Sequence, residues 1–281
     1  MRILAMDIGG TFLKYALYDG ETVLASQKTP SRASEGADAL VQVLFGVGET
    51  FRGQFDGVAV ATAGTVGPEG EILYANGNIP GYTGVPLKKK LEETFSVPVV
   101  VLNDVAAAAY ALTDALEDYF FIAIGTGIGG AYVHQRRLMT GGTGVGGQIG
   151  YLRVEDGRAA DQAASSAALA RRAGESGERV FEKAGQGDER AVRILDEWMD
   201  EVAQVILTAE IVTGAETIVL GGGVSAQGER LLAPLREKLN QMETPCRGRF
   251  RLIAAPDGNA SGTLGAKKYW EESLRQKHER I

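Results

Sequence analysis

The apolar residues of this chain fall into two kinds of segment, which predict strands and helices in alternation. Short apolar runs bounded by glycine, such as residues 2–8, predict buried strands. Residues 188–212 instead carry apolar side chains at helical spacing and stop at Gly214, which predicts a long amphipathic helix. The alternation continues to the end of the chain and indicates an α/β protein with mostly parallel sheets, covered on both faces.

The remaining elements follow from the same patterns. Further strands are expected over residues 12–18, 22–25, 56–61, 97–102, 217–220 and 250–255, and further helices over residues 37–52, 86–95, 106–112, 160–173, 227–240 and 262–278. The Asp19-Gly20 pair is a strong hairpin signal, so we expect the chain to open as a meander of strands.

A glycine-rich turn occurs twice between a pair of strands. The first strand runs into Gly9-Gly10-Thr11, and the apolar run from residue 119 ends at Gly125-Thr126-Gly127. Asp7 and Gly125 occupy similar places in the two segments, so we interpret them as an internal repeat and predict two related domains that face each other. In α/β sheets, ligands bind at the carboxyl ends of strands, and both turns lie at such ends.

Size, charge and cysteine content narrow the functional classes. A length of 281 residues suits two modest domains, and a net charge of −7 argues against a nucleic-acid partner because no basic field would hold phosphates. The single cysteine, Cys246, excludes a disulfide within the chain and a cysteine-rich zinc site. No signal peptide precedes the first strand, and no apolar stretch reaches the ~18 residues of a membrane span, so we expect a cytoplasmic protein without membrane contact.

The first glycine turn combines a carboxylate with bare backbone amides. Asp7 at the strand end can hold a hydrated Mg²⁺ near phosphate oxygens. Gly9 and Gly10 let the backbone approach the phosphates, and Thr11 adds a hydroxyl donor. The alternative is a plain hairpin turn that needs glycine for its backbone angles.

The second turn strengthens the phosphate interpretation. Its residues Gly125, Thr126, Gly127 and Gly129 lead into a strand, and no Gly-Lys-Ser/Thr follows. The turn is therefore neither a Walker loop nor a dinucleotide fingerprint, which opens a helix. Two opposed glycine turns can clamp a polyphosphate from both sides, which one turn alone cannot do.

Two further strand ends carry candidate residues. Gly221-Gly222-Gly223 precedes a helix, where it either flanks an adenosine or forms a tight connection. Asn103-Asp104 also joins a strand to a helix. Asp104 is an N-cap, or a general base that accepts the proton of a hydroxyl during phosphoryl transfer, or both. Asn103 can donate to and accept from neighbouring hydroxyls.

Together these segments resemble the ROK family of bacterial sugar kinases, within the actin/Hsp70/hexokinase fold superfamily. The resemblance runs from Asp7 to the last helix and is carried by DIGGT (7–11), NIPG (78–81), PVVVLND (98–104), IGTGIGG (124–130), GGQIGY (146–151) and LGGG (220–223). It implies a two-domain, ribonuclease H-like α/β fold with a central cleft. Residues 1–105 with the C-terminal helix 262–281 would form a small domain, and residues 106–261 a larger one.

The resemblance also implies ligands and a homodimer. ATP and Mg²⁺ are expected between the domains, with Asp104 as the base. The expected ATP and Mg²⁺ site comprises Asp7 (to Mg²⁺ through water), Gly9, Gly10, Thr11, Gly125, Thr126, Gly127, Gly129, Gly221, Gly222 and Gly223. The expected sugar site comprises Gly64, Asn78, Asn103, Asp104, Gln148, Tyr151 and Asp161.

Three of these residues depart from the family pattern. The usual Gly-Glu-Ile-Gly-His is here Gly147-Gln148-Ile149-Gly150-Tyr151, and the family's cysteine cluster does not follow, so we expect no structural zinc. A family Glu that contacts sugar near the anomeric carbon falls on Asp161. Gln148 donates as well as accepts hydrogen bonds, and Tyr151 either contacts sugar or packs where the zinc module would lie. Zinc-less members of this kind resemble β-glucoside kinases and other hexose kinases.

These features predict a glucokinase-like, ATP-dependent phosphorylation of a hexose or hexose derivative, at its 6-hydroxyl. A kinase for N-acetylmannosamine or for a β-glucoside is the alternative substrate assignment. A non-catalytic sugar-binding regulator is the alternative from another class. Asp7, Asp104 and both glycine turns weigh against the regulator, because all parts needed for phosphoryl transfer are in place.

Overall fold

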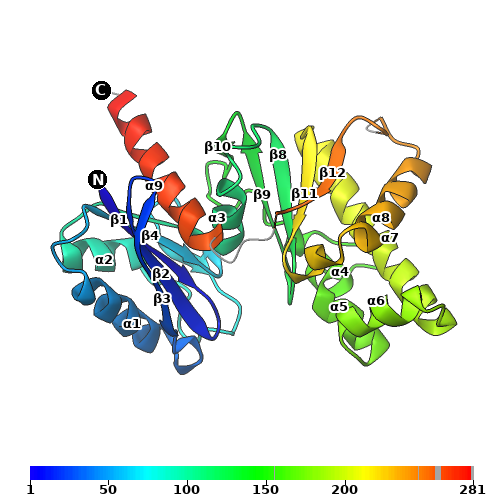
Figure 1. The fold of residues 1–281 in the computed structure, drawn as a ribbon, viewed down its shortest axis with the longest axis horizontal. Helices are drawn as coiled ribbons and strands as arrows, with labels where there is room; N and C mark the ends of the chain where they lie inside the picture. Colours follow the sequence, from blue (N-terminus) through cyan, green and yellow to red (C-terminus); the bar gives the residue numbers. More distant parts are fainter. Residues whose placement is uncertain (155, 246, 257–260, 280–281) are drawn as a thin grey trace. The chain divides into compact units, whose positions relative to one another are not determined.

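The computed structural model describes residues 1–279 apart from 155, 246 and 257–260, so Cys246 lies outside the described residues. The chain forms two compact units (Figure 1). Unit 1 comprises Met1–Ala115, Thr140–Val145 and Gly258–Ile281, and unit 2 comprises Leu116–Met139 and Gly146–Asp257. The predicted division after residue 105 falls inside helix α3 (Asp104–Tyr110), which belongs to unit 1.

Unit 1 is built on a five-stranded sheet with the order β3-β2-β1-β4-β7. Its strands are β1 (Arg2–Ile8), β2 (Phe12–Asp19), β3 (Thr22–Pro30), β4 (Gly57–Thr62) and β7 (Val99–Asn103). The first three are antiparallel neighbours, whereas β4 runs parallel to both β1 and β7. The antiparallel β1–β3 part confirms the predicted opening meander, because short turns leave no room for the crossover that parallel neighbours need.

One face of this sheet packs against two helices. Large apolar side chains of β1 and β4, among them Leu4 and Val58, share a core with helices α1 (Ala37–Thr50) and α2 (Leu87–Phe95). The buried Leu87, Leu91 and Phe95 of α2 are four residues apart, so they form one stripe along the helix. The structure thus confirms the helix that the sequence predicts over residues 86–95.

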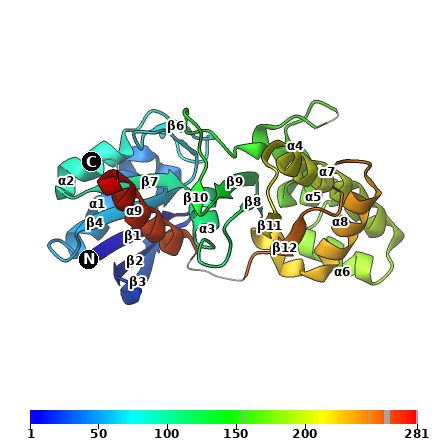
Figure 2. The ribbon, with the colours of Figure 1, turned by 90° about the horizontal axis from the view of Figure 1, so that it is seen from above.

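The other face is covered by the last helix, α9 (Ser261–Glu279), which runs beside α3 (Figures 1 and 2). Successive strand residues point to opposite faces, and this face carries small residues such as Ala5 and Ala59. A Cβ at Gly57 would lie 2.1 Å from the indole ring of Trp270, which is fully buried. The missing side chain at Gly57 therefore makes room for the indole, and α9 lies close to the sheet.

Unit 2 repeats the topology of unit 1. Its sheet has the order β10-β9-β8-β11-β12, formed by β8 (Tyr119–Ile124), β9 (Ile128–His134), β10 (Arg137–Leu138), β11 (Thr217–Gly221) and β12 (Arg251–Ala254). Again the first three strands are antiparallel neighbours, and β11 is parallel to both β8 and β12. The same order in both sheets confirms the predicted internal repeat.

The strand pairing shifts the predicted equivalence within the repeat. Ile8 pairs with Leu13 next to the first turn, and Ile124 pairs with Ile128 next to the second. Ile124 is therefore the counterpart of Ile8, and Ala123 rather than Gly125 stands where Asp7 stands. The second turn consequently has no carboxylate of its own strand beside it.

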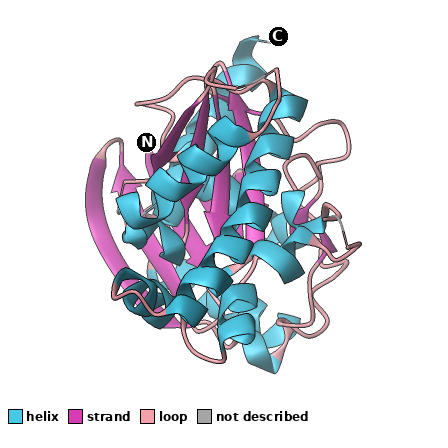
Figure 3. Ribbon diagram, turned by 90° about the vertical axis from the view of Figure 1, so that its right-hand side faces the viewer, coloured by secondary structure: helices cyan, strands magenta, loops and turns pink. Residues whose placement is uncertain are grey.

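The helices of unit 2 lie in front of strands in Figure 3. They are α4 (Ala160–Ala164), α5 (Ser166–Ala173), α6 (Gly177–Gly185), α7 (Glu189–Thr213) and α8 (Glu229–Gln241). The long predicted helix is confirmed as α7, and Gly214 ends it in the left-handed conformation. The single helix predicted over 160–173 is wrong: Ser165 interrupts it, and its hydroxyl oxygen accepts a hydrogen bond from the Ala168 amide as the N-cap of α5.

Short elements complete the fold. β5 (Thr65–Val66) and β6 (Ile72–Tyr74) form a small antiparallel pair, and three 3₁₀ turns cover η1 (Ala33–Glu35), η2 (Ile149–Tyr151) and η3 (Gly223–Gln227). Residues 140–145 belong to unit 1, where a Cβ at Gly144 would lie 2.9 Å from the carbonyl oxygen of Val66. Within the described ranges, no helix has the length and apolar character needed to cross a bilayer.

Candidate active site

The first glycine turn is held from behind by a buried serine. The Gly9 amide donates to the Phe12 carbonyl oxygen at 3.0 Å, which closes the turn between β1 and β2. The Ser31 amide donates to the Thr11 carbonyl oxygen at 3.0 Å, and the Ser31 hydroxyl donates to that of Gly10 at 3.2 Å. The amides of Gly10 and Thr11, both exposed residues, have no hydrogen-bond partner among the residues that the structure describes. Two donors are thus free at the tip of the turn.

The second turn has the same arrangement from different partners. The Gly125 amide donates to the Gly127 carbonyl oxygen at 2.9 Å, and the Ser166 amide donates to the Gly125 carbonyl oxygen at 2.9 Å. The Ile128 amide donates to Oδ1 of Asp161 at 2.7 Å. Within the described part of the chain, the tip amides of Thr126 and Gly127 again have no partner. Successive free amides of this kind form an anion-binding concavity.

The third glycine segment packs against the second turn. Gly222 has a φ of 79°, and a Cβ on it would lie 2.4 Å from the carbonyl oxygen of Ile124, the last residue of β8. A Cβ on Gly221 would lie 2.3 Å from the ring of Phe121. Close packing therefore explains the glycines at these two positions. Contact of Gly221, Gly222 and Gly223 with adenosine stays a prediction.

Asp7 lies at the end of β1 against the start of α9. Its carboxylate leaves no room for a side chain at Gly262, where a Cβ would lie 2.5 Å from Cγ of Asp7. Burial raises the pKa of the half-buried Asp7, and the charge of Lys14, its partner on β2, opposes the rise. The first turns of helices favour negative charge, so the amino end of α9 suits this carboxylate.

Asp104 is the first residue of α3. Its pKa is raised to about 6: burial is the main cause and the negative charge of Asp7 adds to it, whereas a hydrogen bond from the Val105 amide opposes the rise. That bond joins the Val105 nitrogen to Oδ1 of Asp104 at 2.9 Å. A carboxylate with a raised pKa near a second carboxylate is typical of catalytic sites.

Asn103, and not Asp104, is the N-cap of α3. Its Oδ1 accepts hydrogen bonds from the amides of Val105 at 2.9 Å and Ala106 at 3.2 Å. Its Nδ2 donates to the carbonyl oxygen of Gly64 at 2.9 Å. Asn103 therefore ties the end of β7 to the loop after β4, and Asp104 is released from the capping role that the sequence allows for it.

The other sugar-site candidates divide between the two units. In unit 1, Gly64 has a φ of 95°, and Asn78 is exposed on the loop after β6. In unit 2, Gln148 is half-buried just before η2, Tyr151 ends η2 with an exposure of 57%, and Asp161 is exposed in the first turn of α4.

The segment that carries Gln148 and Tyr151 is pressed onto β9. A Cβ on Gly150 would lie 2.2 Å from the carbonyl oxygen of Ile128, and one on Gly147 would lie 2.6 Å from that of Gly130. These close approaches bring the three unit 2 sugar candidates next to the second glycine turn. The sugar-reading and phosphate-binding candidates of this unit thus share one region.

The carboxylate of Asp7 suits a magnesium ion whose other ligands come from substrate and water. No group of three or more His, Cys, Asp or Glu side chains in the described ranges could hold a metal ion. Mg²⁺ in phosphoryl-transfer enzymes needs only one or two carboxylates, since substrate phosphates and water complete its coordination. Asp7, a carboxylate beside the free amides of the first turn, matches that donor set.

Three supporting residues escaped the sequence analysis. Ser31 and Ser166 donate hydrogen bonds to backbone carbonyl oxygens of the first and second glycine turns. Gly262 leaves space for the Asp7 carboxylate. The small residues at Gly262 and Gly265 in the last helix were an available signal, because glycines four or fewer residues apart in a helix often mark a close approach. Nothing local distinguishes Ser31 or Ser166 from other serines.

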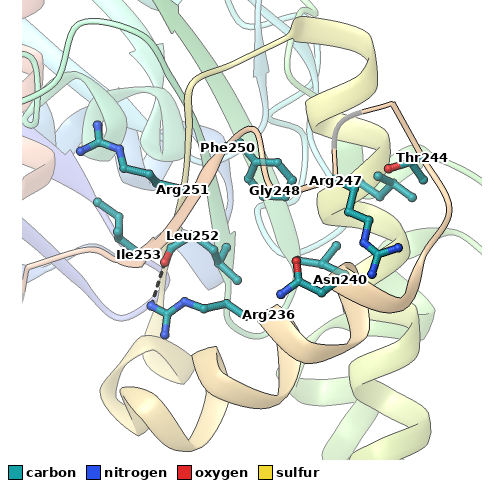
Figure 4. Close-up of a pocket in the computed structure, with 11 residues that line it drawn as sticks. Arg236, Asn240, Thr244, Arg247, Gly248, Phe250, Arg251, Leu252 and Ile253 are labelled. Carbon is teal, nitrogen blue, oxygen red and sulfur yellow. Dashed lines mark hydrogen bonds between the residues drawn. The ribbon is translucent and has the colours of Figure 1, made fainter.

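A separate pocket of about 370 Å³ lies in unit 2 between α7, α8 and β12 (Figure 4). Its lining includes Arg236, whose guanidinium donates to the Leu252 carbonyl oxygen at 2.9 Å, and Arg251 at the start of β12. Arg251 pairs with Thr217 at the start of β11, so the pocket lies at the amino ends of these parallel strands. The second glycine turn and Gly221 lie at the opposite, carboxyl ends of the strands of this unit, and none of the predicted site residues lines this pocket.

Known proteins resemble this chain over nearly its whole length. The sequence model of the ROK family matches residues 3–273. N-acetylmannosamine kinases of Shigella flexneri and of Escherichia coli strain K12 are 32% identical to it over 286 aligned residues, covering 95% of this chain and 97% of theirs. Two solved structures are also similar. A ROK family glucokinase from Streptomyces griseus in complex with glucose and AMPPNP is 27% identical with a TM-score of 0.77, covering 95% of this chain and 98% of its own. A ROK hexokinase from Thermus thermophilus is 26% identical with a TM-score of 0.80, covering 97% and 99%.

Proposed function

The chain belongs to the ROK family, and we propose that it transfers the γ-phosphoryl group of ATP to the 6-hydroxyl of a hexose or hexose derivative. An ATP-dependent sugar kinase is the activity that its curated relatives and similar structures support, and the hexokinase-like α/β fold agrees with it. The single observation that carries the proposal is the state of the Asp104 carboxylate. Its pKa is raised, in part by the nearby charge of Asp7, and Asn103 rather than Asp104 caps helix α3.

Asp104 is suited to the role of general base. With a pKa of about 6 it is mostly ionised at neutral pH, yet it is more basic than an ordinary aspartate. Its Oδ1 accepts a hydrogen bond from the Val105 amide, which orients the carboxylate that would accept the proton of the acceptor hydroxyl. A positioned base of this kind contributes ~10²–10⁴-fold to the rate.

The glycine turns serve the phosphates. The free amides of Gly10 and Thr11, and those of Thr126 and Gly127, are donors for phosphate oxygens, and their fixed geometry needs no reorganisation. Asp7 would hold Mg²⁺ through water. Bound Mg²⁺ and ATP supply the phosphoryl group and the cation that neutralises its charge. Gly221, Gly222 and Gly223 would flank the adenosine, and Gly9, Gly125 and Gly129 let the backbone close on the phosphates.

We assign the sugar to Gly64, Asn78, Asn103, Gln148, Tyr151 and Asp161. Gln148 presents an amide, which donates and accepts, and Tyr151 presents an exposed ring and hydroxyl. N-acetylmannosamine is the second candidate, because the curated relatives that cover 95% of this chain are kinases for that sugar. A β-glucoside is a third acceptor compatible with these side chains.

The test is an ADP-release assay with a panel of hexoses, N-acetylated hexosamines and β-glucosides, run with and without Mg²⁺. Asp104→Asn is expected to keep sugar affinity and to lower kcat by ~10²–10⁴. Asp38→Asn, an exposed change on α1, is the matched control and should retain activity. Sugar binding without sugar-dependent ADP release in the wild type would favour a non-catalytic regulator. The homodimer implied by the family stays a prediction, and light scattering tests it.

A further inference from the structure

We propose that Asp161 is a positioning residue for nucleotide binding, because its carboxylate fixes the shape of the second glycine turn. This inference rests on the proposed function, in which that turn binds phosphate. It adds to the sugar contact already assigned to Asp161 a role on the opposite, nucleotide side of the reaction.

One hydrogen bond joins Asp161 to the end of the second glycine turn. Oδ1 of Asp161 accepts the Ile128 amide at 2.7 Å, a short distance for an N–H···O bond and one typical of a charged acceptor. Ile128 is the first residue of β9 and directly follows the turn. Holding its amide therefore sets where the turn ends and where the preceding amides of Thr126 and Gly127 are placed.

The α4–α5 stretch of the chain holds the second glycine turn at both ends. Asp161 lies in the first turn of α4, and the Ser166 amide, at the start of α5, donates to the Gly125 carbonyl oxygen at 2.9 Å. The break between α4 and α5 at Ser165 separates these two attachments. The α4–α5 stretch thus fixes the turn from Gly125 to Ile128 while the tip amides stay free.

The absence of a side chain at Gly127 leaves space for the carboxylate of Asp161. A Cβ on Gly127 would lie 2.5 Å from Oδ1 of Asp161. Gly127 has no left-handed backbone angle that would demand glycine. The carboxylate of Asp161 is therefore a physical reason for glycine at position 127.

The negative charge of Asp161 affects the nucleotide and the sugar differently. A negative charge beside a phosphate-binding turn repels the ligand, so the charge of Asp161 does not itself favour the nucleotide. Its contribution on this side is to accept a hydrogen bond. The sugar site, in contrast, can use both the charge and the remaining oxygen Oδ2.

Asp161→Asn and Asp161→Ala separate these contributions. Asparagine keeps an oxygen that accepts the Ile128 amide, whereas alanine removes it. Binding of AMPPNP without sugar, measured by isothermal titration calorimetry, should be about tenfold weaker for Asp161→Ala, the usual cost of losing a hydrogen bond to a charged group. Asp161→Asn should bind AMPPNP at least as tightly as the wild type. Glu182→Ala, an exposed change on α6, is the control and should leave this affinity unchanged.

Two further readouts complete the test. Hydrogen exchange of the Ile128 amide should accelerate in Asp161→Ala and stay slow in Asp161→Asn. In steady-state assays Asp161→Ala should raise the KM for ATP, whereas Asp161→Asn should alter only the KM for sugar. Wild-type AMPPNP affinity in Asp161→Ala, or equal weakening by both substitutions, would overturn the proposal. Because AMPPNP binding needs no sugar turnover, failure of the proposed function would appear separately, as a wild type without sugar-dependent ADP release.

Discussion

Replacing Asp104 by asparagine is expected to stabilise the protein while it removes activity. The pKa of Asp104 is raised from 3.8 to about 6, a rise of about two units, and one pKa unit corresponds to about 1.4 kcal/mol. At neutral pH the ionised carboxylate therefore costs the folded state about 3 kcal/mol relative to the unfolded chain. Asparagine keeps the oxygen that accepts the Val105 amide, but its buried NH₂ group offsets about 1 kcal/mol. A net gain of about 2 kcal/mol remains.

The sign of the effect fixes its pH dependence. Because the folded pKa is raised, the carboxyl group is harmless below the unfolded pKa of 3.8, and its cost grows as pH rises toward about 6. Asparagine does not titrate. The stability difference between Asp104→Asn and the wild type should therefore be full at neutral pH and fall to about a third of that value near pH 5, because the cost of the asparagine NH₂ group does not change with pH.

Differential scanning calorimetry of the ligand-free proteins is the assay. At about pH 7.5 the Tm of Asp104→Asn should exceed that of the wild type by roughly 4–8 °C, the shift expected from about 2 kcal/mol in a protein of this size. Glu197→Gln, exposed in the middle of α7, should leave the Tm within about 1 °C of the wild type, as surface changes do. An Asp104→Asn variant no more stable than the wild type, or a difference that grows as pH falls, would refute the reasoning.

The other predictions concern the same site. The kcat/KM of the wild type should fall about tenfold per unit below about pH 6, because Asp104 must be ionised to accept a proton; a pH profile measures this, and a flat profile in that range would exclude Asp104 as the base. Gly262→Ala should lower kcat/KM at least about tenfold, since its Cβ would lie 2.5 Å from Cγ of Asp7, and steady-state kinetics measure the loss. Gly46→Ala, at an exposed position of α1 where a Cβ meets nothing within 4 Å, is the matched control and should instead add about 0.5–1 kcal/mol of stability with normal kinetics.

The parts of the fold that the sequence predicts well are those decided by neighbouring residues. The two glycine turns, the stripe of α2 and the length of α7 follow from local periodicity and from glycine as a stop, and the structure confirms them. The repeat was visible for the same reason, since each copy is a strand, a turn and a strand. Its register was wrong because sequence similarity of the turns does not fix which residues pair.

The parts that were missed depend on contacts between distant segments. Ser165 breaks the predicted helix where the Trp198 indole donates to its carbonyl oxygen, a contact supplied by α7. Asn103 is the N-cap of α3, a role that the sequence analysis considered for Asp104. Asn103 is held in this place because its Nδ2 donates to the Gly64 carbonyl oxygen. The N-cap preferences of Asn and Asp are nearly equal, so no local rule could separate the two.

Unit 1 takes its residues from both ends of the described chain, and this has a consequence for biosynthesis. Gly57 and Gly262 leave spaces that Trp270 and Asp7 fill, so β1 and β4 cannot complete their core until α9 has emerged from the ribosome. Unit 2, apart from the excursion at 140–145, lies between the two parts of unit 1 and can finish folding first. Unit 1 therefore acquires the space around Asp7 only after the residues of unit 2 have been synthesised.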